Sequence, residues 1–312
     1  MIHFLQILGK GENDMSIKVK AFQGLWKLIG KGDSARLAKK DFPTDVIQYT
    51  DIPYIDDGTW EHKLDVYVPE GTKPNARLPV IIDVHGGGWY YGDKELNKFF
   101  CLHLCREGFV VFNMSYRLAP QHNIKDMMED VMSALNYIGN HLKDYPCDKN
   151  RVFITGDSAG GQLASHATAI TINKDMRKAY GVKKPKLKIK AVGLTSPCPY
   201  AKPKGLMKFY LKEIVGKKYK KENYGKYLDF KKVIKTCDDK FPPTIIFTSL
   251  FDVIAEFQAK DAYKLLKKNG TKAKFDKRFN PALQHVYMVT DPDLPGGQRA
   301  IKMMTEFFKN QK

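Results

Sequence analysis

The hexapeptide GDSAGG at residues 156–161 sets a serine, Ser158, among small residues directly after the apolar run RVFIT at 151–155. A serine held at a sharp turn from a strand into a helix needs such neighbours, because bulky side chains two positions away would collide across the bend. The pattern predicts an exposed nucleophile. A serine hydroxyl attacks a carbonyl only when a base takes its proton, so a histidine and a group that orients it are also required.

The position of each histidine along the chain narrows the choice of base. On an open parallel sheet the reacting groups gather at the carboxyl ends of the strands. Five of the eight histidines lie in the N-terminal segment, on an edge strand or within predicted helices, namely His3, His62, His103, His141 and His166. His85, His122 and His285 remain. His285 follows the last predicted strand and precedes the last predicted helix, which makes it the predicted base.

Asp252 is the predicted partner of that histidine, because it follows the seventh predicted strand directly. The chain order Ser158, Asp252, His285 is the order expected when a G-x-S-x-G turn lies in this kind of sheet. Two other carboxylates are weaker candidates, since Asp239 falls in an inserted segment and Asp261 falls inside a predicted helix.

Backbone donors for an oxyanion are predicted in HGGGW at 85–89, which follows the third predicted strand. Glycines expose N–H groups without side chains that would block a close approach. Ala159, directly after the serine, offers another N–H at the positive end of the following helix. A flexible loop and a phosphate cradle are the alternatives for HGGGW, but the segment lacks the lysine of a P-loop and the G-x-G-x-x-G register.

Eight short apolar or β-branched runs alternate with helical patterns, which is typical of a mostly parallel sheet covered by helices on both faces. The first two runs alternate polar and apolar residues, as an antiparallel edge hairpin does. The strands are expected at 46–54, 62–69, 78–84, 109–116, 151–155, 189–196, 244–250 and 273–279. The main helices are expected at 94–108, 125–144, 159–173, 255–270 and 298–310.

Two segments fall outside this alternation, and we assign both to a small helical cap over the site. Residues 1–45 include a basic amphipathic helix at 20–32, and an insert at about 199–240 is rich in lysine and tyrosine. Residues 46–312 then form the catalytic domain. A membrane-surface role for the first helix stays open, because its apolar residues are flanked by lysines; these residues are Phe22, Leu25, Trp26, Leu28 and Ile29.

The charge and the cysteine content limit which partners, cellular compartment and metal sites are expected. The chain of 312 residues carries a net charge of +18, and residues 201–235 hold 12 lysines against three acidic residues. Such a segment either binds a polyanion or is a solvated surface, and we favour the second reading. The five scattered cysteines include no C-x-x-C pair, which favours the reducing cytoplasm and no metal site.

Targeting signals and membrane spans are not evident in the sequence. No apolar run approaches the length of a transmembrane helix, so stable membrane insertion is not expected. The N-terminal MIHFLQILG lacks the basic region and the cleavage site of a signal peptide. Met1 and Met15 both stay open as the natural start.

Taken together, HGGGW, YRLAP at 116–120, GDSAGG, Asp252 and His285 resemble the hormone-sensitive-lipase-like branch of the α/β-hydrolases, over about residues 45–310. The resemblance implies Ser158 as nucleophile, Asp252 as acid and His285 as base. It also implies an oxyanion hole formed by the N–H groups of Gly87, Gly88 and Ala159. The chain departs from this family in reading SLFDVIAE where relatives show D-P-L, and in its basic insert.

The resemblance implies a cofactor-free serine hydrolase of carboxylic esters, of the carboxylesterase or acetyl esterase type. Acyl groups from acetyl to hexanoyl are expected, because the insert is short and the sequence shows no apolar lipid-binding surface. Esters of acetylated or feruloylated carbohydrate, an amidase or formamidase reaction, and a non-catalytic polyanion-binding role are the alternatives. A homodimer is left open. The tentative substrate contacts are Trp89, Tyr90, Tyr200, Ile254 and Val286.

Overall fold

The structure is a computed structural model that describes residues 15–73, 75–201, 208–237 and 240–311. Its eight strands form one sheet in the order β1-β2-β4-β3-β5-β6-β7-β8. β2 pairs antiparallel with both β1 and β4, whereas every other pairing is parallel. The bounds are β1 Val46–Pro53, β2 Lys63–Pro69, β3 Leu78–Val84, β4 Val110–Met114, β5 Cys147–Asp157, β6 Ile189–Thr195, β7 Thr244–Ser249 and β8 Ala273–Arg278.

All eight predicted strands and the predicted edge hairpin are confirmed. β5 is longer than expected, because it begins at Cys147 and passes through a polar stretch before its apolar half. The apolar half pairs with β3 and β6 along its two edges, and its side chains are buried on both faces of the sheet, as its continuous run of apolar residues indicates.

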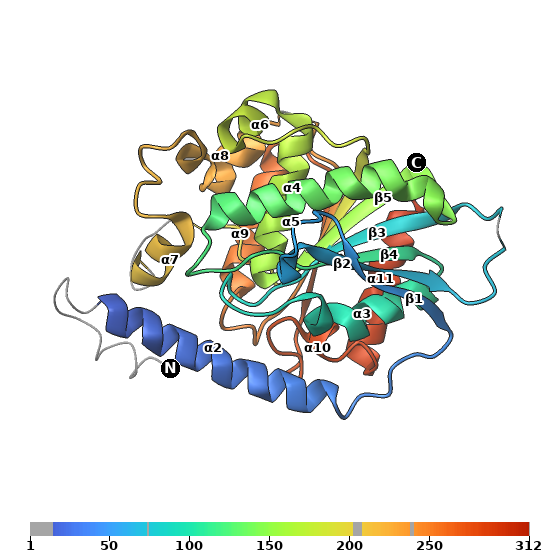
Figure 1. The fold of residues 1–312 in the computed structure, drawn as a ribbon. Helices are drawn as coiled ribbons and strands as arrows, with labels where there is room; N and C mark the ends of the chain where they lie inside the picture. The colour runs from blue at the N-terminus through green and yellow to red at the C-terminus, as the bar shows by residue number, and fades with distance from the viewer. Residues whose placement is uncertain (1–14, 74, 202–207, 238–239, 312) are drawn as a thin grey trace.

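Helices cover both faces of the sheet (Figure 1). One buried cluster includes side chains of α4, α5 and α9, and the other includes side chains of α3, α10 and α11. The bounds are α2 Met15–Leu37, α3 Lys94–Arg106, α4 Ile124–His141, α5 Ser158–Ile172, α6 Lys174–Tyr180, α7 Lys208–Val215, α8 Phe230–Lys235, α9 Glu256–Lys268, α10 Tyr287–Thr290 and α11 Pro295–Lys309.

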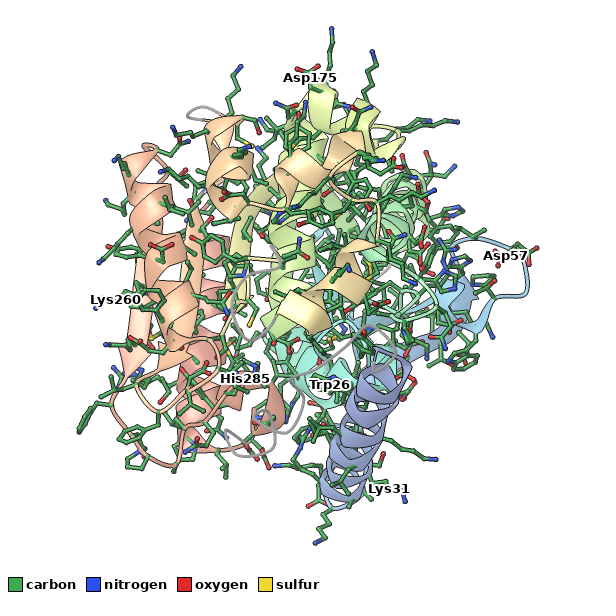
Figure 2. The ribbon with its side chains drawn as sticks, turned by 90° about the vertical axis from the view of Figure 1, so that its left-hand side faces the viewer. Trp26, Lys31, Asp57, Asp175, Lys260 and His285 are labelled. Carbon is green, nitrogen blue, oxygen red and sulfur yellow. The ribbon has the colours of Figure 1, made fainter. Side chains whose placement is uncertain are left out.

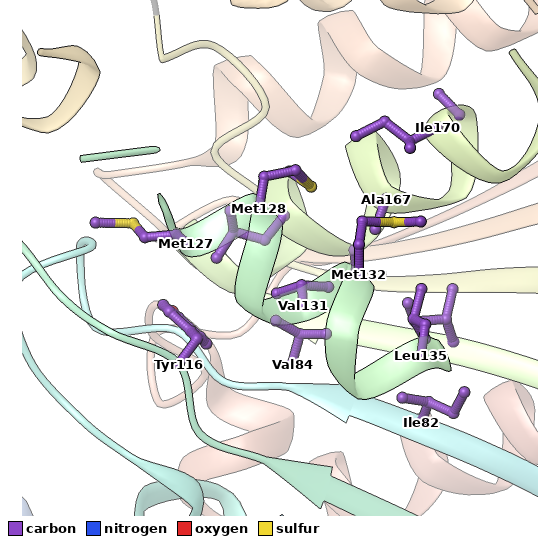
Figure 3. Close-up of a cluster of buried hydrophobic side chains, with 14 of the residues drawn as sticks. Ile82, Val84, Tyr116, Met127, Met128, Val131, Met132, Leu135, Ala167 and Ile170 are labelled. Atoms are coloured by element: carbon purple, nitrogen blue, oxygen red, sulfur yellow. The ribbon is translucent and has the colours of Figure 1, made fainter. Parts of the chain in front are cut away.

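The larger cluster shows how alternate strand residues meet a helix face. Ile82 and Val84 point from β3 toward α4, which presents a face rich in methionine (Figure 3). The side chains that α4 buries recur three and four residues apart, which is the period of a helix face turned to a core. They include Met127, Met128, Val131, Met132 and Leu135. Ile81 and Asp83, the intervening residues of β3, face the α3 side.

The helix α2 lies across the connections at the carboxyl ends of the strands. Trp26 stacks on Tyr91, with ring centroids 5.9 Å apart, in the segment that follows HGGGW. Further along the chain, the Arg36 guanidinium donates to the carbonyl oxygen of Thr290 at 2.7 Å. Thus α2 contacts both the loop after β3 and the segment after β8. No helix in the described part of the chain is long and apolar enough to cross a bilayer.

Candidate active site

Ser158 is the first residue of α5 and follows the last residue of β5. Its φ is 50°, a left-handed conformation that side-chain-bearing residues rarely adopt and that turns the chain sharply between strand and helix. A Cβ on Gly156 would come within 2.5 Å of the Gly160 carbonyl oxygen, and a Cβ on Gly160 would overlap the carbonyl oxygen of Val84. The small residues around Ser158 are therefore required by the bend, as the motif predicts.

The structure brings Ser158, Asp252 and His285 together. His285 Nε2 lies 3.0 Å from Ser158 Oγ, and His285 Nδ1 lies 2.9 Å from Asp252 Oδ1. His285 comes from the loop between β8 and α10, and the N–H of the next residue, Val286, donates to Ser196 Oγ at 3.1 Å. This bond fixes the loop that carries the histidine.

Asp252 lies just beyond the end of β7 and its side chain is buried. Burial raises the pKa of this carboxyl, but the hydrogen bond and charge of His285, the Ser196 hydroxyl and the Ala255 N–H outweigh burial, so the pKa is below its ordinary value. The N–H groups of Ile254 and Ala255 both donate to Oδ1. An ionised carboxylate held in this way keeps the proton of His285 on Nδ1 and leaves the Nε2 lone pair directed at Ser158.

The other aspartates and histidines considered as acid or base form no hydrogen bond with Ser158 among the described residues. Asp239 lies outside the described residues, and Asp261, on α9, accepts a hydrogen bond from the Tyr200 hydroxyl. His122 pairs loosely with Asp126 at the start of α4. His85, the third histidine that the sequence left as a candidate base, is buried at the start of the glycine loop.

The glycine loop after β3 has positive φ angles, which favour glycine. Gly87 and Gly88 have φ values of 102° and 62°. A Cβ on Gly87 would overlap the carbonyl oxygen of Tyr91, and a Cβ on Gly88 would overlap the Trp26 ring of α2. The Tyr210 hydroxyl of α7 donates to the Gly88 carbonyl oxygen. The loop is therefore enclosed between β3 and the two helices α2 and α7.

Hydrogen bonds set the planes of the peptides in this loop. His85 Nδ1 lies 2.8 Å from the Gly86 carbonyl oxygen, which belongs to the peptide that carries the N–H of Gly87. Burial lowers the pKa of His85 to about 4, so its ring is neutral and donates this bond. The Gly87 carbonyl oxygen accepts from the Tyr91 N–H at 3.1 Å, which orients the N–H of Gly88.

Two buried carboxylates that sequence reasoning missed lie directly beneath this loop. Asp157 Oδ1 accepts from the Gly86 N–H at 2.9 Å and from Asn97 Nδ2 at 2.8 Å, and Asn97 Nδ2 also lies 2.9 Å from Asp83 Oδ2. Burial raises the pKa of Asp157 to about 6. Burial and the charge of Asp157 raise the pKa of Asp83 to about 8. The pair therefore retains a proton at neutral pH.

Cys198 also borders the nucleophile and was missed. Its Sγ lies 3.8 Å from Ser158 Oγ, and its backbone N–H donates to the Ser158 carbonyl oxygen at 2.9 Å. Burial raises the pKa of this thiol to about 12, so it is protonated at neutral pH. All five cysteines are free and buried. In the described part of the chain, no group of three or more histidine, cysteine, aspartate or glutamate side chains could hold a metal ion.

The five tentative substrate contacts have different surroundings. Trp89 is buried and its indole N–H donates to Gln162 Oε1 at 3.2 Å. Tyr90 is stacked on Tyr210, with ring centroids 5.1 Å apart. The Tyr200 hydroxyl donates a hydrogen bond to Asp261 of α9. Ile254 is about half exposed and Val286 is partly buried, and each is close in the chain to Asp252 or His285. The contact of each with a substrate stays a prediction.

The strand order, the serine at the turn into α5 and the glycine loop after β3 define an α/β-hydrolase of the hormone-sensitive-lipase-like kind. A comparison with protein-family models agrees, because the BD-FAE model matches residues 64–260. That match spans more than half of the chain. The chain belongs to the BD-FAE family.

Individual relatives are esterases. A probable isoprenylcysteine alpha-carbonyl methylesterase, ICMEL1 of Arabidopsis thaliana, is 32% identical over 120 residues, which are 38% of this chain and 24% of that protein. Carboxylesterase NlhH of Mycobacterium tuberculosis is 32% identical over 110 residues, 35% of this chain and 34% of that protein. These matches span about a quarter to a third of the length of the curated relatives.

A solved structure resembles the chain over nearly its full length. Esterase B from Lactobacillus rhamnosis, solved with a C4-C4 SN3 tributyrin phosphonate, is 28% identical with a TM-score of 0.87. The alignment covers 96% of this chain and 96% of that chain. The likeness therefore extends beyond the family match, to the segments that precede β1 and follow α9.

Proposed function

We propose that this protein is a carboxylic ester hydrolase with Ser158 as nucleophile, His285 as general base and acid, and Asp252 as the group that orients His285. The observation that carries the proposal is the hydrogen-bonded series Asp252–His285–Ser158, with both distances near 3 Å and the serine on a strained turn. The carboxylesterase among the relatives and the fold of esterase B support the same reaction class.

The first half of the reaction forms an acyl-enzyme. Ser158 Oγ attacks the ester carbonyl carbon while its proton moves to His285 Nε2. The carbonyl oxygen becomes an oxyanion, which the N–H groups of Gly87, Gly88 and Ala159 would stabilise. When the tetrahedral intermediate collapses, the bond to the alkoxy oxygen breaks and His285 returns the proton to that oxygen. The alcohol leaves and the acyl group stays on Ser158.

In the second half of the reaction, water takes the place of the alcohol and hydrolyses the acyl-enzyme. His285 Nε2 takes a proton from a water molecule whose oxygen attacks the acyl carbon. Collapse of the second intermediate releases the carboxylic acid, and the proton returns to Ser158 Oγ. Asp252 stays ionised throughout and stabilises the imidazolium that forms in each half.

The acyl group is proposed to be short, from acetyl to hexanoyl. Cys198 and the turn after β6 lie against one side of Ser158, and Tyr210 and Trp26 lie over the glycine loop, so the space beside the nucleophile is bordered closely. The C4-C4 tributyrin phosphonate with which esterase B was solved is consistent with this size in that protein. Carbohydrate esters and amides stay alternative predictions.

Residues 1–45 and the insert at about 199–240 are proposed to form a cap over the site. Trp26 against Gly88 and the Tyr210 hydroxyl on the Gly88 carbonyl oxygen support this assignment for the described parts of both segments. We also propose that the protein acts in the cytoplasm, which the five free thiols favour. Formation of a homodimer stays a prediction that gel filtration decides.

Hydrolysis of p-nitrophenyl esters from acetate to decanoate tests the proposal. Ser158→Ala should reduce turnover to near background, a loss of roughly 10⁶-fold. Ser165→Ala is the matched control, because Ser165 is a buried serine of the same helix whose hydroxyl donates to the carbonyl oxygen of Gln162. Substantial turnover by Ser158→Ala, or a folded native protein that cleaves no ester of the series, would contradict the proposal.

A further inference from the structure

Exposed apolar side chains are concentrated around the site. Twelve large apolar side chains are exposed among the described residues, and nine of them lie on segments at the carboxyl ends of the strands. The other three lie on β1 or beside β2, at the far edge of the sheet. We call the nine the apolar rim: Leu25, Leu28 and Ile29 of α2, Leu250, Val253, Ile254 and Phe257 at and after the end of β7, and Phe279 and Leu294 after β8.

The two sides of the apolar rim flank the triad. Val253 directly follows the buried Asp252, and the ring of Phe279 lies 5.6 Å from that of Phe251, so the segments after β7 and β8 form one side. The other side is α2, whose Trp26 contacts the glycine loop. Figure 2 shows His285 at the centre of this face, between α9, which carries Lys260, and α2.

The most exposed of the twelve large apolar side chains belong to the apolar rim. Val253 is 87% exposed, Phe279 79% and Phe257 78%. Single exposed apolar residues are common on soluble proteins, but a set gathered on one face marks an interaction site. On α2, Trp26 is turned inward onto Tyr91, whereas Leu28 is turned outward and is 68% exposed. Some apolar residues of α2 thus pack against the rest of the protein, and others are exposed to solvent.

Two exposed lysines of α2 lie beside the apolar rim. Lys27 and Lys31 of α2 are exposed, and among the described residues neither forms an ion pair. Four acidic side chains on this face pair with three basic ones, so the pairs leave one negative charge against the two positive charges of Lys27 and Lys31. These pairs are Asp291 and Asp293 with Lys40, Glu256 with Lys277, and Asp33 with Arg36. Protruding apolar side chains with exposed lysines beside them are the pattern of a surface that binds anionic lipid.

We propose that the apolar rim docks this end of the molecule peripherally on an anionic lipid surface. The side chains of the rim would enter the headgroup region, and Lys27 and Lys31 would face the lipid phosphates. His285, which lies between α9 and α2 (Figure 2), would then be on the side of the molecule that faces esters dispersed in the lipid. Docking requires neither Ser158 nor turnover, so it goes beyond the proposed reaction and is testable apart from it.

Cosedimentation of the full chain with vesicles tests the proposal. Vesicles of phosphatidylcholine are compared with vesicles that also contain about a third of phosphatidylglycerol. We expect the native protein to bind the anionic vesicles more strongly, and 0.5 M NaCl to weaken that binding. The double variant Phe257→Ser/Phe279→Ser should lower the partition coefficient about tenfold. Ile47→Ser/Tyr49→Ser removes exposed apolar residues at the far edge of the sheet and should leave binding unchanged.

Hydrolysis of dissolved p-nitrophenyl acetate by the same variants separates docking from catalysis. Both double variants should retain native turnover and native thermal unfolding, so a loss of vesicle binding cannot come from a damaged site. Ser158→Ala should bind vesicles as the native chain does. The proposal fails if the native chain stays in the supernatant of both vesicle types, or if the far-edge variant loses as much binding as the rim variant. It also fails if the rim variant instead converts a stable dimer into a monomer.

Discussion

Replacement of Asp83 by asparagine should change how stability depends on pH. Burial and the charge of Asp157 raise the pKa of Asp83 from 3.8 to about 8. Between these values the folded protein retains a proton that the unfolded chain has released. The free energy of unfolding must therefore fall as the pH rises through this window, by about 1.4 kcal/mol per pH unit from this group.

Asparagine resembles the protonated acid, because it keeps an acceptor for the Asn97 N–H and carries no charge. Asp83→Asn should therefore remove the contribution of Asp83 to this slope. From pH 5 to pH 7 the variant should gain about 3 kcal/mol of stability relative to the native chain.

Urea unfolding at pH 5, 6 and 7 measures this difference directly. Asp148→Asn is the control, because burial raises the pKa of Asp148 but Arg151 and the Asn150 N–H outweigh burial and lower it. Asp148 is then ionised in both states above pH 5, and its variant should differ from the native chain by a constant amount. If the Asp83→Asn and native curves run parallel over this range, Asp83 is ionised in the folded state and the reasoning is wrong.

Two substitutions at the site give further tests. Gly160→Ala places a Cβ against the carbonyl oxygens of Val84 and His85, so thermal unfolding should show a loss of about 3 kcal/mol or more, whereas Gly24→Ala, with open space around its Cβ, should not be destabilised. Asp252→Asn removes the charge that holds the proton of His285 on Nδ1, and ester kinetics should show kcat lowered on the order of 10³- to 10⁴-fold with little change in KM. A native-like Gly160→Ala protein or a fully active Asp252→Asn enzyme would refute the corresponding argument.

The sequence predicts most of the architecture because the strands are continuous apolar runs between turns. It does not reveal α6 or α10, of 7 and 4 residues, because so few residues cannot display a helical period. For α6 a local signal exists: Asn173 caps its start, and Gly181 ends it with a φ of 72°.

That Ser158, Asp252 and His285, the proposed triad, lie close together was predictable, because each follows a strand whose end must lie at the same edge of the sheet. The surroundings of the triad were not. Asp83 lies within the apolar run LPVIIDV, and only the register of β3 against β5 shows that it approaches Asp157. Cys198 reaches Ser158 through the turn after β6, which no spacing in the sequence encodes.

The apolar rim likewise cannot be predicted from any short stretch of the sequence. Its members come from α2 and from the segments after β7 and β8, more than 200 residues apart at the extremes. Periodicity also does not distinguish Trp26, which packs inward, from Leu28, which faces outward, because both belong to the apolar residues of one helix. Only the placement of α2 over the glycine loop assigns the two residues to different surroundings.

The hydrogen bond from the Gly86 N–H to Asp157 joins the glycine loop to the residue that precedes Ser158, the proposed nucleophile. The serine and the anchor of the oxyanion loop are consecutive, so their separation is fixed by a single peptide bond. We expect Ser158 and the glycine loop to move together when the surrounding helices shift, because this hydrogen bond links them directly. A scaffold built in this way tolerates wide variation in its outer helices while its reaction geometry stays constant.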